Sequence, residues 1–222
     1  MNRWLWAIGM ICSVGVAGQT AALTSTNYYL VAELTNTAVH MDSFVIGLTN
    51  AAQIAHAQAL IAQGPTASST IVFANVAAGA DGINRDHLNS EAPAWSWHVT
   101  QVTGFGDMGI ELIDGWPTLL ESDVPGWMKN TGGHIGFWSY TVSAALPFSP
   151  RIEGITQSQD GIVLSVDKLT PPFPLIVETS TNLTDPVWTV QSRLVPQHSK
   201  SNLFLPMQAG TAFIRLRVGA NP

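Results

Sequence analysis

A cluster of tryptophans between residues 94 and 138 constrains the fold of this chain more than any other feature. Five of the eight tryptophans lie in this stretch, together with His98, Glu111 and Asp114. A tryptophan side chain is large and has a polar N–H group that needs a partner when it is buried. A dense cluster therefore forms either the centre of a core or the wall of a binding site. The tryptophans concerned are Trp95, Trp97, Trp116, Trp127 and Trp138.

The first 22 residues have the order of a secretory signal peptide. Arg3 gives a positive start, an apolar run extends from Trp4 to Val16, and small residues follow up to Ala22. The run is shorter than the ~20 residues that a membrane span needs. We therefore expect a cleaved signal, a secreted or periplasmic location, and no stable span in the mature protein. Cys12 lies inside the signal, so the mature chain has no cysteine for a disulfide or a thiolate metal site.

The charge of the chain is divided unevenly. Residues 23–150 carry only Arg85 and Lys129 against ten acidic residues, a net charge of −8, whereas residues 151–222 carry six bases and five acids. Nucleic-acid binding needs clustered Lys and Arg, so the acidic part excludes it. An anionic membrane surface is disfavoured for the same reason. A cation or a basic protein partner is compatible with this charge.

A change of composition and two prolines within four residues predict two domains joined by the linker 147–150. We expect residues 23–146 to form an α+β domain, with a mostly antiparallel sheet and one main helix at 50–63 that Gly64-Pro65 ends. Thr49-Asn50 is expected to supply its N-cap, and Gln53 is placed for a capping box. A short helical turn is expected at 117–120. The expected strands are 27–34, 43–48, 70–77, 95–102, 108–113 and 137–146.

Residues 151–222 are expected to form a small all-β sandwich with Trp188 in its core. The expected strands are 161–166, 175–179, 187–194, 202–205 and 211–218. The segments VETSTNL at 177–183, WTV at 188–190 and FIRLR at 213–217 are similar to β-rich modules that end secreted bacterial proteins. That similarity implies an adhesive or spacer module rather than a catalyst.

Five short motifs occur in a fixed order in the first domain. They are FVIGL at 44–48, QIAHAQAL at 53–60, WSWH at 95–98, IELIDG at 110–115 and FWS at 137–139. With these motifs, residues 27–146 resemble the N-terminal domain of the BP-seventy-four calmodulin-binding protein family. The family pattern is similar to a strand, a helix, W-S-F/W-H, E-x-C-D and C-P-W-S in that order. The resemblance implies a fold and no settled chemistry.

The chain departs from the family pattern at both of its cysteines. Ile113 replaces the cysteine of E-x-C-D, and Gly136-Phe137 replaces Cys-Pro in C-P-W-S. The resemblance implies a disulfide that was lost as a unit, with Ile113 packed in its place. Calmodulin is not an expected partner, because its targets are basic amphipathic helices and the helix at 50–63 has no Lys or Arg.

Two groups of side chains with oxygen and nitrogen ligands are candidate metal sites. His98, Glu111 and Asp114 suit zinc if the strands that carry them pair, although a regular strand would place Glu111 and Asp114 on opposite faces. Asp81 and Asp86 lie in a loop at 81–91 that suits calcium but lacks the spacing of an EF-hand. In both cases a solvated turn or a structural role is the competing interpretation. The literal G-x-G-x-x-G at 104–109 is interpreted as a hairpin turn, because no helix follows it.

Two functions follow from these residues. The first is an exported binding or structural protein that uses Trp95, Trp97, His98 and Trp138 to contact a carbohydrate or a basic protein. The second is a hydrolase-like or metal-binding protein that uses His98 with Glu111 or Asp114. Trp97 and Trp138 are themselves expected to be mainly structural, since large aromatics on strands usually face a core. The exposure of the tryptophans should separate the two functions.

Overall fold

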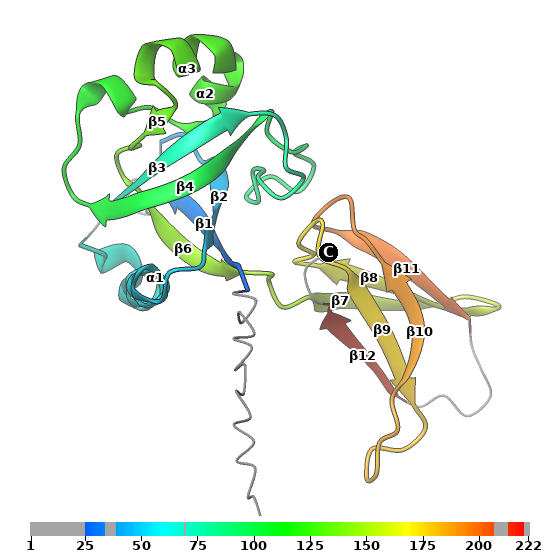
Figure 1. The fold of residues 1–222 in the computed structure, drawn as a ribbon. Coiled ribbons are helices and arrows are strands. Elements are labelled where there is room, and N and C mark those ends of the chain that lie inside the picture. The colour runs from blue at the N-terminus through cyan, green and yellow to red at the C-terminus, as the bar shows by residue number, and fades with distance from the viewer. Residues whose placement is uncertain (1–24, 34–38, 69, 207–212, 220–222) are drawn as a thin grey trace, which may run out of the picture.

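The computed structural model describes residues 25–33, 39–68, 70–206 and 213–219. The expected signal peptide at 1–22, with Cys12, lies outside the described residues. Figure 1 shows an N-terminal part (25–149) with strands and helices, followed by a C-terminal part (150–219) made of strands. This is the β-rich α+β architecture that the sequence predicts. No strand of one part pairs with a strand of the other in the described chain, and independent folding of the two parts stays a prediction.

The N-terminal part contains two three-stranded sheets, with orders β2-β1-β6 and β4-β3-β5, and every neighbouring pair is antiparallel. β3 and β4 form the longest pairing, from Ile71 opposite Gly106 to Ala78 opposite Trp97. The strands are β1 Asn27–Glu33, β2 Ser43–Leu48, β3 Ile71–Ala78, β4 Trp97–Gly106, β5 His134–Ile135 and β6 Tyr140–Leu146.

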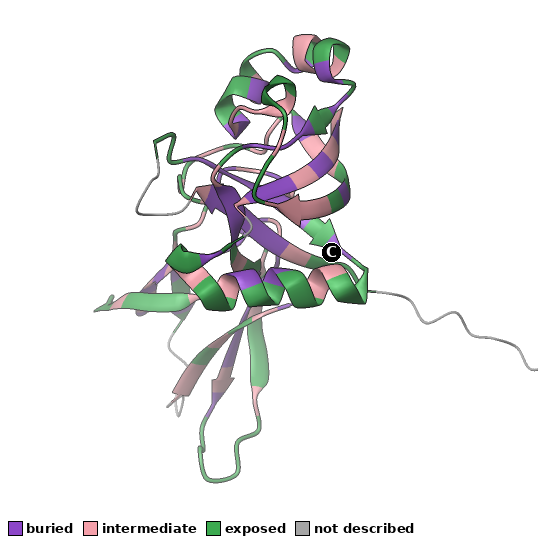
Figure 2. Cartoon of the chain, turned by 90° about the vertical axis from the view of Figure 1, so that its left-hand side faces the viewer, coloured by how far each residue is buried: buried purple, intermediate pink, exposed green. Residues whose placement is uncertain are grey.

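The main helix is α1 Ala51–Gln63, and it packs against β6 (Figure 1). Asn50 caps it as predicted, because its side chain accepts hydrogen bonds from the backbone of Ala52 and Gln53. The expected capping box is wrong, since the Gln53 side chain instead donates to the carbonyl of Val102 at 3.0 Å. Figure 2 shows the exposed residues on the outer side of this helix. The other helices are η1 Gly64–Thr66, η2 Glu111–Ile113, α2 Pro117–Ser122 and α3 Val124–Thr131.

Aromatic rings from distant segments fill the core of the N-terminal part. The Phe44 ring is 5.9 Å from that of Trp97 and 5.8 Å from that of Phe137, between ring centroids. Phe137 also meets Tyr140 at 5.7 Å. α1 adds Ala57 and Leu60 to the same core. The WSWH, FVIGL and FWS motifs therefore meet in one cluster.

The expected strand at 108–113 is wrong. β4 continues through Gly104 to Gly106, so these glycines do not form the expected hairpin turn. Beyond β4 the chain forms a 3₁₀ turn, in which Ile113 N donates to Ile110 O at 3.2 Å. Segment 108–113 lacks a neighbouring strand in the described structure, and without one its alternating side chains do not fix a β conformation. β5, β7 and α3 are elements that the sequence did not predict.

The C-terminal part has two three-stranded antiparallel sheets, with orders β11-β8-β7 and β10-β9-β12. Its core is aliphatic and includes Leu164, Val177 and Leu205. Trp188 is not in this core; the Arg215 guanidinium lies 4.2 Å from its ring centroid, so the expected role of Trp188 is wrong. The strands are β7 Arg151–Gln157, β8 Gly161–Asp167, β9 Leu175–Ser180, β10 Thr189–Leu194, β11 Ser201–Pro206 and β12 Phe213–Val218.

Candidate functional site

Trp95 and Trp97 belong to the core. Trp97 is fully buried, and its indole N–H finds no partner among the described residues. The Trp95 ring stacks on Trp97 with a centroid distance of 6.3 Å, and its N–H donates to the carbonyl of Ser43 at 2.9 Å. A hydrogen bond also fixes the His98 ring, because its Nδ1 lies 2.7 Å from the carbonyl oxygen of Gly79. Trp97 therefore faces the core, as expected, and its structural role stays a prediction.

Trp138 lies at the surface, which corrects the expectation that it faces a core. Its side chain is 46% exposed. The backbone N–H of Trp138 donates to Asp114 Oδ1 at 2.8 Å, and the same oxygen accepts from Gly115 N at 2.8 Å. The segment before β6 is thus held by a side chain instead of by a neighbouring strand. Trp138 is thereby placed at the edge of the 3₁₀ turn.

Three apolar side chains of the 108–112 segment also face solvent. Met108, Ile110 and Leu112 are 81%, 64% and 62% exposed. Gly109 lies among them, and a Cβ at Gly109 would stand 3.5 Å from the Trp138 indole nitrogen. We call Met108, Ile110, Leu112 and Trp138 the Trp138 surface. Neighbouring exposed apolar side chains of this kind mark interaction sites in proteins.

A tight junction below this surface holds the 3₁₀ turn in place. Gly136 N donates to Ile113 O at 2.9 Å. A Cβ at Gly136 would come within 2.9 Å of both Ile113 Cδ1 and the Phe73 ring. Ile113 and Gly136 therefore occupy adjoining positions, as expected if Ile113 fills the space of a lost cross-link. Their contact fixes the turn without a covalent bond.

The charges around the Trp138 surface are negative. Asp107 and Glu111 alternate with its exposed aliphatic residues, and both are exposed. Asp114 follows directly after the turn. No Lys or Arg occurs between Arg85 and Lys129. The Trp138 surface therefore has an apolar centre and carboxylates at its rim.

The structure does not bring His98, Glu111 and Asp114 together as a metal site. His98 pairs with Ala77 on β3, whereas the 3₁₀ turn packs at Phe73. Four residues of strand separate these points, roughly 13 Å at the usual rise. In the described part of the chain, no group of three or more His, Cys, Asp or Glu side chains could hold a metal ion.

The carboxylates of the 81–91 loop have structural partners. Asp81 Oδ1 accepts from Ile83 N at 2.8 Å and from Asn84 N at 2.7 Å, which closes a turn. Asp86 is buried, and its Oδ1 accepts from Ser43 Oγ at 2.8 Å. Burial raises the pKa of Asp86, although its hydrogen bonds act in the other direction. The two carboxylates thus stabilise the loop, and in the described chain they belong to no group of three or more acidic, His or Cys side chains that could hold a metal ion.

A buried polar network joins distant segments, and no sequence pattern indicated it. Asp42 accepts hydrogen bonds from the hydroxyl of Tyr140 and, at 2.6 Å, from Thr118 Oγ1. Burial, followed by the bond to Asp42, raises the pKa of Tyr140. The Asn84 side chain donates to the carbonyl of Trp97 at 2.9 Å and accepts from Val45 N at 2.8 Å. These contacts join β2, the 81–91 loop, α2 and β6, and they are structural.

The N-terminal part has a β-rich α+β fold. It contains two small antiparallel sheets, one packed helix and a tethered 3₁₀ turn. The family described as the BP-seventy-four N-terminal domain matches residues 27–149, and the chain belongs to this family. No curated protein and no solved structure matches the chain. The similarity of the C-terminal part to modules of secreted bacterial proteins stays a prediction. None of the helices in the described ranges is long and apolar enough to cross a membrane.

Proposed function

We propose that this protein is an exported binding protein whose Trp138 surface docks a partner with an apolar patch and a basic rim. The observation that carries the proposal is the exposure of Met108, Ile110 and Leu112 in a segment whose Gly109 adjoins the exposed Trp138. Burying such side chains on binding yields about 25 cal/mol for each Å² of apolar surface. The export component rests on the signal-like order of residues 1–22.

The nature of the partner follows from the rim of the surface. Methionine and aromatic residues are enriched in protein interfaces, and the Trp138 surface contains one of each, Met108 and Trp138. A carbohydrate site relies on flat aromatic faces, and Trp138 is the single ring of this surface. Asp107 and Glu111 would attract Lys and Arg side chains and would disfavour acidic partners. A basic protein or peptide therefore fits better than a neutral sugar.

The test uses two synthetic amphipathic peptides of equal length, one alternating Leu with Lys and the other alternating Leu with Glu. Calorimetry with the purified protein should show micromolar binding of the Leu/Lys peptide, about −8 kcal/mol, and none of the Leu/Glu peptide. Trp138→Ala and Met108→Ser should each weaken binding at least tenfold. Leu183→Ser is the matched control, because Leu183 is 53% exposed in the C-terminal part.

Three results would contradict the proposal. The two peptides could bind equally well, Leu183→Ser could weaken binding as much as Trp138→Ala, or the affinity could be independent of salt, which screens exposed charges. Loss of glucan-oligosaccharide binding in Trp138→Ala, with no peptide binding by the wild type, would replace the basic partner by a carbohydrate. N-terminal sequencing of secreted protein tests the predicted export and signal cleavage. Secreted protein that still begins at Met1 would refute this part of the proposal.

A further inference from the structure

A pocket lies where the 81–91 loop meets the C-terminal part. Its volume is about 370 Å³, within the range of sites for small molecules. The N-terminal part contributes His87, Ser90 and Phe148, and the C-terminal part contributes Asp167, Lys168 and Lys200. Sites at domain junctions commonly bind ligands, because two surfaces converge there without filling the space. Residues from both parts would thus contact one ligand.

Three hydrogen bonds hold the two sides of the pocket together. Ser199 N donates to Ser90 O at 3.4 Å, and Arg85 Nη1 donates to Gln197 O at 3.1 Å. On the linker side, Phe148 N donates to Thr170 Oγ1 at 2.9 Å. Ser90, Ser199 and Phe148 also line the pocket.

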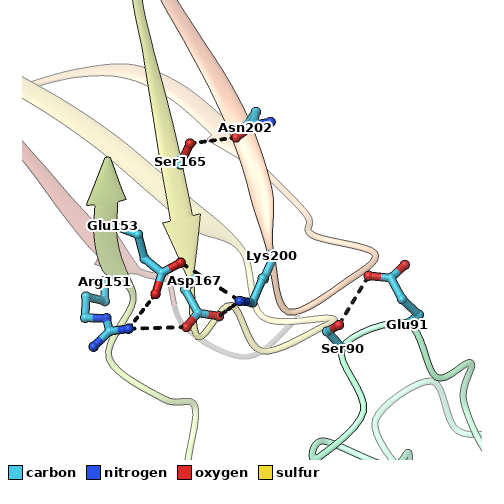
Figure 3. A network of polar contacts seen from close by, with 8 residues as sticks. All are labelled: Ser90, Glu91, Arg151, Glu153, Ser165, Asp167, Lys200 and Asn202. Atoms are coloured by element: carbon cyan, nitrogen blue, oxygen red, sulfur yellow. Dashed lines mark hydrogen bonds and ion pairs between the residues drawn. The ribbon is translucent and has the colours of Figure 1, made fainter. Parts of the chain in front are cut away.

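The charged groups of the pocket leave one positive charge in excess. Lys168 lines it without an ion pair to any residue that the structure describes. Figure 3 shows Lys200 beside Asp167, with Nζ–O distances of 4.0 Å to Asp167 and 3.9 Å to Glu153. These long contacts leave room for a stronger partner. Two ammonium groups against the lining carboxylate of Asp167 favour a singly charged anion over a phosphate dianion.

Lys168 also has an unusual backbone conformation. Its φ of 58° lies in the left-handed region that side chains with a Cβ rarely adopt. Glycine would occupy this position at lower cost. The lysine therefore introduces backbone strain at the edge of the pocket, as residues at ligand sites often do.

His87 forms a neutral part of the pocket wall. Its Nε2 is buried and has no hydrogen-bond partner among the described atoms, although the residue lines the pocket. Burial, and then the charge of Arg85, lower the pKa of His87 to about 4, so the ring is neutral near pH 7. The charge of the pocket therefore comes from Lys168, Lys200 and Asp167.

We propose that this pocket binds a small hydroxylated monocarboxylate, of which a sugar acid is the example. Lys168 and Lys200 would hold the carboxylate, while Asp167 would accept from a hydroxyl group. The hydroxyls of Ser90 and Ser199 can donate or accept. The Phe148 ring offers an apolar wall to the C–H face of the ligand. This proposal is independent of the Trp138 surface.

The experiment measures binding of glucuronate to the whole protein by calorimetry, with glucose, acetate and inorganic phosphate as matched probes. Glucuronate should bind at least tenfold more tightly than each of them, because glucose lacks the charge and acetate lacks the hydroxyls. Lys168→Gly should weaken glucuronate binding at least tenfold. Because glycine relieves the left-handed backbone, this variant should stay folded and melt no lower than wild type. Lys129→Met is the control, since Lys129 is an exposed lysine outside the pocket.

A second arm identifies the source of the ligand. A free acid requires that glucuronate bind better than a glucuronate-terminated oligosaccharide, and a polysaccharide end requires the reverse order. The proposal is overturned if glucose or acetate binds as well as glucuronate. It is also overturned if Lys168→Gly and Lys129→Met have the same effect, or if phosphate is preferred. Failure of Trp138→Ala to affect peptide binding leaves this result unchanged, so the two sites are tested separately.

Discussion

Trp97 and Trp138 come from the same set of sequence motifs and have opposite environments. Trp97 is fully buried between Phe44 and Trp95, and Trp138 is 46% exposed beside Gly109. The difference arises from the backbone that carries each residue. Trp97 begins a strand that pairs with β3, whereas Trp138 lies in a segment held by the Asp114 side chain. A strand pairing directs side chains into a core, and a tethered turn can leave them in solvent.

This contrast predicts that the Trp97 region serves stability, and the proposed function places binding at the Trp138 surface. The Trp97 region is also tied to the buried network through Trp95, whose N–H donates to Ser43. Ser43 in turn donates to Asp86 and accepts from His87 N at 2.8 Å. Changes near Trp97 should therefore affect folding, and changes at the Trp138 surface should affect a partner more than folding.

Trp97→Ala should produce the largest loss of stability. It removes a fully buried ring and leaves a cavity, for which we expect a loss of about 3–5 kcal/mol in the free energy of unfolding. Denaturant titration of the purified protein, followed by far-ultraviolet circular dichroism, measures this loss. Trp97→Phe is the matched control and should cost clearly less, because it keeps an aromatic ring and removes the unpaired indole N–H. Equal losses in both variants would contradict a packing role.

A second large effect should appear in the pH dependence of stability. The pKa of His87 falls from the ordinary 6.5 to about 4 in the folded protein. Between these values the unfolded chain takes up a proton that the folded protein does not. Stability is therefore complete above pH 6.5 and is lost as the pH falls toward 4, by up to about 3 kcal/mol. Asp86 acts in the opposite direction, because burial raises its pKa and protonation favours the folded state.

Unfolding titrations at a series of pH values measure this dependence. His87→Gln should flatten the curve between pH 6.5 and 4. His198→Gln is the control, because His198 is half exposed and lies 3.3 Å from the exposed Glu91. A curve that keeps its slope in His87→Gln would show that another group is responsible.

Elements with a strong local signal were predictable from the sequence. The α1 helix follows from the Asn50 cap, its apolar stripe and the Gly64-Pro65 end, and the structure reproduces it. β3, β4 and the α2 turn begin within two residues of their expected positions. The 108–113 segment was assigned incorrectly because Met108, Ile110 and Leu112 alternate as in a half-buried strand. An alternating pattern of apolar residues indicates which side chains share a face. It does not indicate whether another strand or helix covers that face.

Contacts between distant segments could not be predicted from the sequence. The bonds of Asp42 to Tyr140 and to Thr118 join residues that are far apart in the chain. The pocket between the two parts needs a relative placement that no local pattern encodes. The exception is the junction of Ile113 with Gly136, which the loss of both family cysteines predicted. A paired departure from a family pattern therefore carried contact information that composition and periodicity did not.

Gly136→Ala tests whether this junction places the Trp138 surface. The added methyl group would stand 2.9 Å from Ile113 Cδ1 and from the Phe73 ring, so we expect a loss of about 1–3 kcal/mol from overpacking. Peptide binding should weaken as well, because the 3₁₀ turn must shift. Gly154→Ala is the control, since a methyl group there meets no atom closer than 3.8 Å. Identical melting of both variants would contradict the tight junction.

Trp138→Ala should cost less stability than Trp97→Ala and should have the largest effect on binding. The residue is 46% exposed, so its truncation should cost about 2 kcal/mol in the free energy of unfolding. The backbone bond to Asp114 survives the substitution because it uses the Trp138 N–H group. Denaturant titration and calorimetry on the same preparation measure both quantities. A stability loss as large as that of Trp97→Ala, with peptide binding unchanged, would place Trp138 in the core and remove the functional distinction between the two tryptophans.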